Sequence, residues 1–383
     1  MTLPTTGPFK VCFVIGTRPE AIKVWSLVVE LKRRADFDVQ VVLSGQHREL
    51  LRQAVGLLGL PVTLDLDVMQ PAQSLERLTA TLVERVSEAL AQLRPDAVIV
   101  QGDTTTVFVG ALAAFYAQIP VGHLEAGLRS GDVRHPFPEE MNRRLTSALA
   151  DWHFTPTQTA RQTLLAEGVP AERIWVTGNT GIDALRLMHA NLDRYPGDPR
   201  LAAVLACPAG RLLAVTVHRR ENQPFMRRIA EAFARVLELH RDIRIVFPVH
   251  FSPAVRAAFT PVLGDQPRCH LLEPVDYADF VRLLARSHLV LTDSGGVQEE
   301  APHLGKPVLV LRRTTERPEA VSAGVARLVG DEPDAIVAAV TELLTDAEAY
   351  RRMARRISPY GDGYASPRIA DILTHSIRKR GRS

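Results

Sequence analysis

Short apolar runs alternate with stretches of helical periodicity along the whole chain. This alternation predicts parallel β-strands joined by crossover helices. In the first half, the predicted strands cover residues 10–16, 38–44, 96–102, 119–125 and 152–156. After a polar segment that contains proline and glycine, the pattern starts again with five further apolar runs, "RLLAVTV", "IRIVFPV", "CHLLEPV", "HLVLTDS" and "KPVLVLR".

These two series predict an α/β fold of two doubly wound, Rossmann-like domains with a cleft between them. A length of 383 residues is enough for two domains with sizeable cores. We expect the first domain to cover residues 1–186 and the second to cover 187–360, with "DRYPGDPR" (193–200) as a linker. A final helix within 361–383 is expected to pack back onto the first domain.

Composition narrows the class of protein. Hydrophobic residues make up 46% of the chain and charged residues 23%, which is typical of a soluble globular protein. The net charge of +3 is small and the basic residues are scattered, so we expect no nucleic-acid partner. Three distant cysteines without a CxxC motif indicate neither a disulfide framework nor a zinc site. Without a signal-peptide pattern or a membrane-spanning apolar run, we expect a cytoplasmic enzyme.

Ligands of open α/β sheets bind beyond the carboxyl ends of the strands, so the residues there are the candidates. Arg18 and Pro19 follow the first strand, and Pro19 suits the first turn of a helix. Arg18 therefore stands at a helix N-terminus, which attracts anions, with Lys23 one turn further on. Taken alone, two such basic residues are more often plain surface charges. No GxGxxG motif accompanies them, which argues against a dinucleotide cofactor.

The second domain repeats this arrangement in "TDSGGVQEE". Gly295 and Gly296 allow a close approach of the backbone to an anion, and Ser294 adds a hydroxyl group at the start of a helix. A diphosphate is the natural occupant, and Glu300 lies one turn into the helix, within plausible reach of a ribose diol. A tightly packed, capped turn explains these residues equally well. Arg317, on a nearby loop, favours the phosphate.

Carboxylates and one histidine occupy other strand ends. Asp103 and Glu125 each end an apolar run, Glu139 and Arg143 are four residues apart on a predicted helix, and His218 follows the first strand of the second domain. Each has a plainer explanation, such as a helix cap for Asp103 or a helix salt bridge for Glu139 and Arg143. Five such groups at the ends of strands, beside two anion sites, are hard to explain by chance and indicate an active site.

The chain resembles a known family in several blocks that appear in the expected order along almost its whole length. It is similar to the non-hydrolysing UDP-N-acetylglucosamine 2-epimerases. The matching blocks are "GTRPEAIK", "QGDTTT", "HLEAGLRS", "FPEEMNRR", "TGNTGIDAL", "HRREN", "TDSGGVQEEAPHLGKPVLVLR" and "TTERPEAV". The resemblance implies two Rossmann-like domains of the GT-B type with UDP bound by the second, a homodimer, and interconversion of UDP-GlcNAc and UDP-ManNAc.

The implied chemistry fits the candidate residues. The hydrogen on C2 of the sugar is not next to a carbonyl group, so its direct removal and return is too difficult. The remaining route of low energy expels UDP, forms 2-acetamidoglucal and adds UDP back. That route needs cations and N–H groups at the diphosphate and carboxylates around the ring, and no metal or cofactor is expected. The resemblance implies catalytic roles for Asp103, Glu125, Glu139, Arg143 and His218. It implies substrate contacts for Arg18, Lys23, Phe280, Ser294, Gly295, Gly296, Glu300 and Arg317.

A second ligand site and several alternatives complete the sequence-based picture. "GQHRE", "HRREN" and "PVHF" match the family's second site, where UDP-GlcNAc binds as an activator. That match implicates Gln46, His47, Arg219, Arg220 and His250. The alternatives are a 2-epimerase for a related UDP-sugar, a GT-B glycosyltransferase, and a sugar-nucleotide sensor without turnover. A glycosyltransferase usually needs one base and a sensor needs none, whereas this chain offers several acids.

Overall fold

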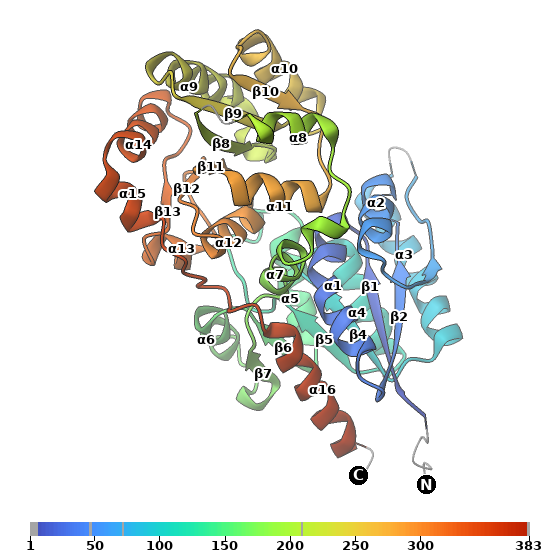
Figure 1. The fold of residues 1–383 in the computed structure, drawn as a ribbon. Coiled ribbons are helices and arrows are strands. Elements are labelled where there is room, and N and C mark those ends of the chain that lie inside the picture. Colours follow the sequence, from blue (N-terminus) through green and yellow to red (C-terminus); the bar gives the residue numbers. More distant parts are fainter. Residues whose placement is uncertain (1–6, 46–47, 71–72, 208–209, 381–383) are drawn as a thin grey trace. The chain divides into compact units, whose positions relative to one another are not determined.

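The computed structural model describes residues 7–45, 48–70, 73–207 and 210–380, with backbone only at residues 48 and 377–380. The chain divides into two compact units, Met1–Leu187 with Tyr360–Ser383 and Met188–Pro359. Figure 1 shows them coloured along the sequence. Each unit is built on its own parallel sheet, and each is described below by itself.

The first unit contains a seven-stranded parallel sheet in the order β3-β2-β1-β4-β5-β6-β7. The central strands are apolar over most of their length, as a sheet covered on both faces requires. The register pairs Phe9 with Phe37 between β1 and β2. The strands are β1 (Phe9–Ile15), β2 (Phe37–Leu43), β3 (Val62–Asp65), β4 (Ala97–Gln101), β5 (Val121–Leu124), β6 (Trp152–Thr155) and β7 (Ile174–Val176).

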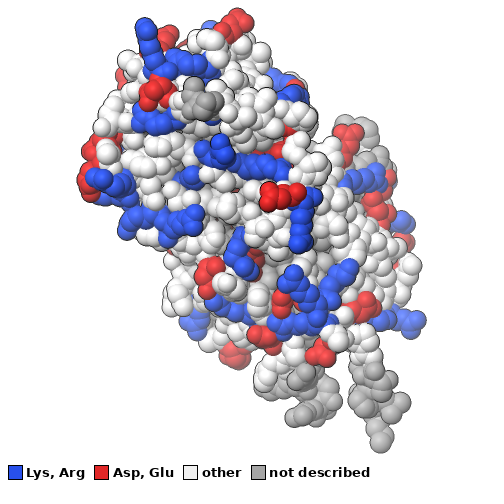
Figure 2. Space-filling model, in the orientation of Figure 1, with Lys and Arg blue, Asp and Glu red and all other residues white. Residues whose placement is uncertain are grey.

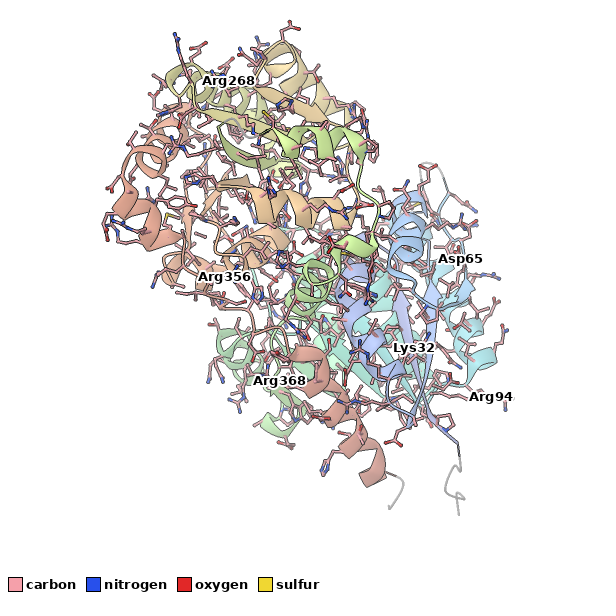
Figure 3. The ribbon with its side chains drawn as sticks, viewed as in Figure 1. Lys32, Asp65, Arg94, Arg268, Arg356 and Arg368 are labelled. Carbon is pink, nitrogen blue, oxygen red and sulfur yellow. The ribbon has the colours of Figure 1, made fainter. Side chains whose placement is uncertain are left out.

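Helices of this unit connect the strands, and the last helix of the chain joins them. Asp183 accepts hydrogen bonds from the backbone N–H groups of Ala365 and Ser366, and Arg368 (labelled in Figure 3) donates to the Thr177 carbonyl oxygen. These bonds anchor α16 beside α1. The helices are α1 (Arg18–Lys32), α2 (Arg48–Leu58), α3 (Leu75–Leu93), α4 (Thr105–Tyr116), α5 (Glu139–Leu149), α6 (Gln158–Ala166), α7 (Thr180–His189) and α16 (Ala365–Arg380), with the 3-10 turn η1 (Ala171–Arg173).

The second unit contains a six-stranded parallel sheet in the order β10-β9-β8-β11-β12-β13. Its strands are β8 (Arg211–Thr216), β9 (Ile243–Pro248), β10 (Cys269–Leu272), β11 (Leu289–Thr292), β12 (Val308–Val310) and β13 (Ala326–Leu328). Its helices are α8 (Pro199–Ala206), α9 (Met226–Leu239), α10 (Pro253–Leu263), α11 (Tyr277–Arg286), α12 (Gly295–His303), α13 (Pro318–Ser322), α14 (Pro333–Thr345) and α15 (Ala347–Met353), with the 3-10 turns η2 (Leu192–Arg194) and η3 (Arg220–Phe225).

Both sheets have the same winding. From the first strand of each unit, the order runs outward to one side through the next two strands and then restarts on the other side. This is the doubly wound topology, so the predicted α/β class of two Rossmann-like domains is confirmed. The strand order reverses between β1 and β4 in the first unit and between β8 and β11 in the second. Loops that follow these four strands therefore lie at the positions where such folds bind ligands.

The surface carries charges of both signs. On the face shown in Figure 2, lysine and arginine side chains alternate with aspartate and glutamate rather than forming one continuous basic region. Among the described residues, no helix has the length and apolar character needed to cross a bilayer. Cys12 and Cys269 are buried, Cys207 is exposed, and all three thiols are free.

Candidate active site

The loop between β1 and α1 is held by a buried carboxylate that sequence reasoning missed. Glu20 accepts hydrogen bonds from the backbone N–H of Gly16 at 2.7 Å and from the Thr17 hydroxyl at 2.8 Å. A Cβ atom at Gly16 would lie 2.3 Å from the Thr106 hydroxyl, so only glycine fits there. The result is a tight turn that puts Arg18, partly exposed, at the first position of α1.

Glu20 is also unusual in its protonation. Burial raises the pKa of its carboxyl group to about 7, against the lowering effect of its hydrogen bonds to Gly16 and Thr17, and the charge of Asp103 raises it further. Glu20 therefore changes charge near neutral pH directly beneath the turn. The capping-box spacing of Thr17 and Glu20 was a signal in the sequence for this contact.

Asp103 follows β4 and is not the helix cap. Thr104 takes that role, because its hydroxyl accepts the Val107 N–H of α4. Asp103 is instead bound by Arg143 of α5, whose Nε and Nη2 atoms lie 2.9 and 2.5 Å from Oδ2. The Asp103 side chain is 30% exposed whereas that of Arg143 is 7% exposed. A buried guanidinium group thus presents a partly exposed carboxylate at the carboxyl end of the sheet.

His123 stabilises the turn between β4 and Asp103. Its Nε2 atom lies 2.8 Å from the carbonyl oxygen of Gly102, which has a left-handed backbone with φ of 87°. Burial lowers the pKa of His123 to about 3. The ring is therefore neutral and donates its Nε2 proton to the Gly102 carbonyl group. This bond holds the residue before Asp103 in place.

Glu125 directly follows β5 in a conformation rare for a residue with a side chain. Its φ of 65° lies in the left-handed region, which costs on the order of 1–3 kcal/mol and persists only where the surroundings impose it. Lys23 Nζ lies 2.5 Å from its Oε2 atom, and the Gln101 amide group donates to the same oxygen. The Glu125 side chain is 6% exposed and that of Lys23 is 16% exposed. Lys23 and Glu125 therefore form a partly buried ion pair at the first switch point.

The helix α5 supplies two acids in different surroundings. Glu140 is fully buried and accepts from the Ser130 N–H and from Arg143 at 3.0 Å, with Arg144 at 3.5 Å. Glu139 is partly exposed, and its Oε2 atom is buried without a hydrogen-bond partner in the described part of the chain. A buried polar atom left unsatisfied is costly, so this oxygen is suited to a proton or a ligand. The sequence singled out Glu139 as a candidate and did not single out Glu140.

In the second unit, a buried aspartate organises the loop after β8. Asp293 accepts from the backbone N–H groups of His218 and Arg219 and from the Asn222 side chain, at 2.9 to 3.1 Å. The His218 ring stacks on that of His250, with centroids 5.7 Å apart. Burial lowers the pKa of His218, opposed by the charge of Asp293. The loop thus carries a largely neutral imidazole at the second switch point.

The start of α12 forms a cradle closed by an arginine. A Cβ atom at Gly295 would lie 2.5 Å from Nη1 of Arg317, so the guanidinium group packs directly on this glycine. A Cβ atom at Gly296 would meet open space. The hydroxyl of Ser294, the N-cap residue, makes no capping bond within the helix. Backbone N–H groups, a hydroxyl group and a guanidinium group thus meet at one helix N-terminus, an arrangement that suits an anion.

The other predicted residues of this unit lie near these elements. Glu300 of α12 accepts from the Tyr277 hydroxyl at 3.2 Å, and Phe280 is partly exposed on α11. Arg219 is partly buried, whereas Arg220 and His250 are exposed. Gln46 and His47 lie outside the described residues.

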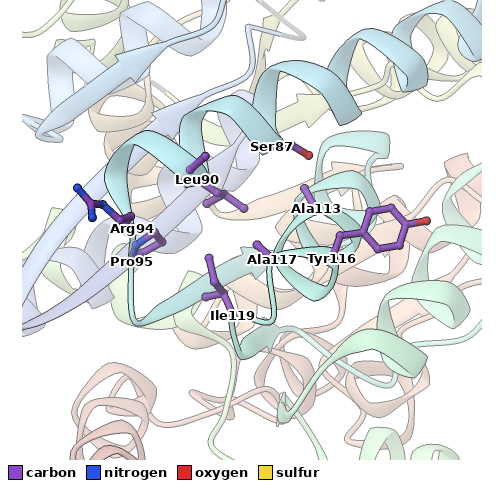
Figure 4. A pocket seen from close by; sticks show the side chains of 9 residues that line it. Ser87, Leu90, Arg94, Pro95, Ala113, Tyr116, Ala117 and Ile119 are labelled. Atoms are coloured by element: carbon purple, nitrogen blue, oxygen red, sulfur yellow. The ribbon is translucent and has the colours of Figure 1, made fainter. Parts of the chain in front are cut away.

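A hollow elsewhere in the first unit is not the site. It has a volume of about 460 Å³ and lies between the ends of α3 and α4 (Figure 4). Arg94 and Pro95 precede β4, and Ile119 precedes β5, so the hollow opens at the amino ends of the strands. The candidate residues are at the opposite ends.

The structure therefore assembles two groups. Lys23, Asp103, Glu125 and Arg143, joined by the unpredicted Glu20 and Glu140, surround the first switch point. The His218 loop, the α12 cradle and Arg317, joined by the unpredicted Glu299 and Glu316, surround the second.

Comparison with known proteins gives consistent matches. A family model described as UDP-N-acetylglucosamine 2-epimerase matches residues 29–374. The UDP-N-acetylglucosamine 2-epimerase of Escherichia coli K12 is 48% identical over 376 residues, covering 96% of this chain and 99% of that protein. That of Bacillus subtilis is 46% identical over 372 residues, covering 95% and 94%.

Solved structures agree as well. The crystal structure of UDP-GlcNAc 2-epimerase from Neisseria meningitidis bound to UDP-GlcNAc superimposes with a TM-score of 0.90 at 42% identity, covering 96% of this chain and 100% of that one. The enzyme of Methanocaldococcus jannaschii in complex with UDP-GlcNAc and UDP gives 0.83 at 33% identity, covering 96% and 100%. With the whole length matched in sequence and in fold, this chain belongs to the UDP-N-acetylglucosamine 2-epimerase family.

Proposed function

We propose that the chain carries out the 2-epimerase reaction of its family by eliminating UDP from C1 of the sugar and adding it back to C1, with the configuration at C2 inverted. UDP-GlcNAc and UDP-ManNAc are the two ends of this reversible reaction. The observation that carries the proposal is the pair of residue groups at the two switch points. One is rich in carboxylates and suits proton transfer, and the other is an arginine-closed helix N-terminus that suits a diphosphate.

The reaction balances without a co-reactant. In the elimination, the bond between C1 and the β-phosphate oxygen breaks, and its electron pair leaves with UDP. The C2 proton passes to a protein base, and the C2 electron pair forms the double bond of 2-acetamidoglucal. In the addition, a proton is delivered to the other face of C2 while the phosphate oxygen bonds to C1 again.

The first group supplies the proton chemistry in this proposal. A base must remove the proton from one face of C2, and an acid must deliver a proton to the other face. Asp103, Glu125 and Glu139 provide the carboxyl groups for these two roles. Arg143 fixes the orientation of Asp103 through two contacts, and Lys23 does so for Glu125. Groups held in this way need little reorganisation when charge develops on the ring, which is the main source of electrostatic catalysis.

The second group supplies the leaving-group chemistry. Departing UDP gains negative charge on its β-phosphate, and the α12 N-terminus, Ser294 and Arg317 offer N–H groups, a hydroxyl group and a cation to it. Glu300 suits the ribose diol and Phe280 the uracil end, with His218 close to the diphosphate or sugar. Arg18 at the start of α1 is a further cation that suits a phosphate.

Product analysis tests the activity. Incubation with UDP-GlcNAc, followed by proton NMR, is expected to yield UDP-ManNAc up to a constant ratio without any acceptor. A glycosyltransferase would instead consume UDP-GlcNAc only when an acceptor is supplied, and a sensor would leave it unchanged. A 2-epimerase for a related UDP-sugar would turn over that sugar and leave UDP-GlcNAc intact.

Regulation by the substrate is a further part of the proposal. Arg219 and Arg220 directly follow His218 in the chain, and the His250 ring stacks on that of His218. The resemblance assigns such residues, with Gln46 and His47, to an activator site for UDP-GlcNAc. A second ligand favours whichever conformation it binds better, and a closed state would retain the glycal and UDP between the two steps.

The activator site is tested by a progress curve from highly purified UDP-ManNAc. A lag that a trace of UDP-GlcNAc abolishes is expected, whereas full speed from the first seconds would contradict the site.

The homodimer implied by the resemblance and the expected cytoplasmic location belong to the proposal as well. Light scattering that gives the mass of one chain would contradict the dimer. Recovery of the native protein in a membrane or secreted fraction would contradict the location.

A further inference from the structure

A buried carboxylate, Glu316, lies among three guanidinium groups of the second unit. Its Oε1 atom is 2.5 Å from Nη1 of Arg317 and 3.4 Å from Nη2 of Arg219. Its Oε2 atom is 2.8 Å from Nη1 of Arg312. The Glu316 side chain is 6% exposed. Sequence reasoning assigned it no role.

The charge state of Glu316 is fixed by these neighbours. Burial alone would raise the pKa of its carboxyl group, but Arg317, Arg312 and Arg219 together hold the pKa well below its usual range. Glu316 is therefore an anion at neutral pH. Burying such a charge costs desolvation energy that ion pairing seldom more than offsets, so stability by itself is a weak reason for this arrangement.

Arg317 is held at two of its nitrogen atoms. Glu299 contacts Nε at 2.6 Å, and Glu316 contacts Nη1 at 2.5 Å. Between these contacts the guanidinium group packs on Gly295, where a Cβ atom would lie 2.6 Å from its Cζ atom. An arginine side chain has many rotamers, and a ligand that must order it loses affinity accordingly. Two carboxylates that order it beforehand remove that loss.

We propose that Glu316 is a positioning residue for the diphosphate, which acts by holding the Arg317 guanidinium group against Gly295 at the start of α12. This inference rests on the proposed function, because that function places the diphosphate of UDP at α12. Glu316 does not touch the ligand in this account. As an anion near a phosphate site it also repels the ligand, so positioning and charge have opposite effects on UDP affinity.

Two substitutions separate these effects. Glu316→Asp keeps the charge but withdraws the carboxylate by one methylene group, whereas Glu316→Gln keeps the length and removes the charge. Affinities for UDP and for uridine, which lacks phosphates, are measured by calorimetry. We expect both variants to bind UDP about tenfold more weakly than the parent and uridine equally well. If Glu316 acted only as a nearby charge, Glu316→Gln would bind UDP more tightly and Glu316→Asp would match the parent.

A double-mutant cycle tests whether Glu316 acts through Arg317. In an Arg317→Ala background, adding Glu316→Gln should weaken UDP binding no further, because the group that it holds is gone. An additive second loss would overturn the proposal. Glu342→Gln is the matched control, since it removes the partner of Arg327 from an ion pair of the same unit, at α14 and β13. It should leave the affinity for UDP unchanged.

The two hypotheses fail in different ways. If the parent protein does not bind UDP, or if Arg317→Ala has no effect, the proposed diphosphate site is wrong. If Arg317→Ala weakens UDP binding but both Glu316 variants match the parent, the site stands and only the positioning role is wrong. Thermal unfolding establishes that each variant is folded, and Glu316→Asp carries the test should Glu316→Gln not fold.

Discussion

The two units have the same doubly wound topology but very different chemistry at their switch points. In the first unit, carboxylates predominate, and each of Asp103 and Glu125 has one basic partner. In the second unit, the carboxylates are matched by arginines, and Glu316 alone contacts three of them. Topology therefore decides where a site forms, and a few residues after the strands decide what it does.

The two groups also differ in how completely they are satisfied. In the first unit, Glu125 has a left-handed backbone, and Glu139 has a buried oxygen without a hydrogen-bond partner among the described residues. Both features cost folding energy. In the second group, Arg317 is paired at both Nε and Nη1. Groups that must exchange protons are kept in strained or incomplete surroundings, whereas a group that must bind an anion is fixed in advance.

The largest expected effect comes from the carboxylates of the first unit. Asp103→Asn, Glu125→Gln and Glu139→Gln should each lower turnover by about 10²–10⁴-fold, because each removes a candidate acid or base. Affinity for UDP should be unchanged, since the proposed diphosphate site is built from residues of the second unit. Steady-state kinetics and calorimetry measure the two quantities.

The matched control for these variants is Glu88→Gln, which disrupts an exposed pair with Arg85 on α3 of the same unit. It should keep full turnover. Near-normal turnover in all three carboxylate variants would show that the first switch point is not the site of proton transfer, and the contrast between the units would lose its functional meaning.

A smaller effect is expected at the second switch point. Arg317→Ala should weaken UDP binding by about 10- to 100-fold, which corresponds to the roughly 1.5–3 kcal/mol of a hydrogen bond to a charged group. Arg317→Lys keeps the charge but lacks the planar guanidinium group. Its affinity for UDP should therefore lie between those of the parent and Arg317→Ala. Arg327→Ala is the control on the exposed pair with Glu342. Equal UDP affinity in all these proteins would exclude the cradle as the diphosphate site.

The smallest expected effect concerns pH and Glu20. The pKa of its carboxyl group is about 7 in the folded protein, whereas its usual value, which applies to the unfolded chain, is 4.5. Between these values the folded form keeps a proton that the unfolded form has lost, so this group makes stability fall as pH rises and has no further effect above pH 7. Glu20→Gln lacks the titration. The unfolding free energy of Glu20→Gln, relative to that of the parent, should therefore rise by about 2 kcal/mol from pH 5 to pH 7.

Urea unfolding at several pH values measures this difference. All other titrating groups are common to the two proteins, so the difference between their curves isolates Glu20. Curves that stay parallel from pH 5 to 7 would contradict the buried, protonated carboxyl group beneath the Arg18 turn.

Local pattern predicts the strands of this fold well, because a buried parallel strand is a continuous apolar run. The runs at residues 10–16 and 119–125 correspond to β1 and β5, which end a residue earlier. β3 is a mostly exposed edge strand, so its sequence lacks such a run. The short strand β7 escaped notice, because three residues carry too little periodicity.

The candidate site was predictable only where a charge interrupts an apolar pattern. Glu125 stands out because it ends "VGHLE", and Asp103 because it follows "VIVQG". Glu140, Glu299 and Glu316 look like ordinary surface residues in sequence. Their burial depends on distant partners, such as the Ser130 N–H for Glu140 or Arg317 for Glu299. Tertiary contacts of that kind leave no local signal.

One measurement tests the central claim most directly, which is that the C2 proton leaves the sugar during epimerisation. The protein is incubated with UDP-GlcNAc in heavy water, and the C2 position is followed by NMR. The elimination and addition route predicts that UDP-ManNAc appears with deuterium at C2 as fast as it forms. UDP-ManNAc that retains its original hydrogen at C2 would contradict this account.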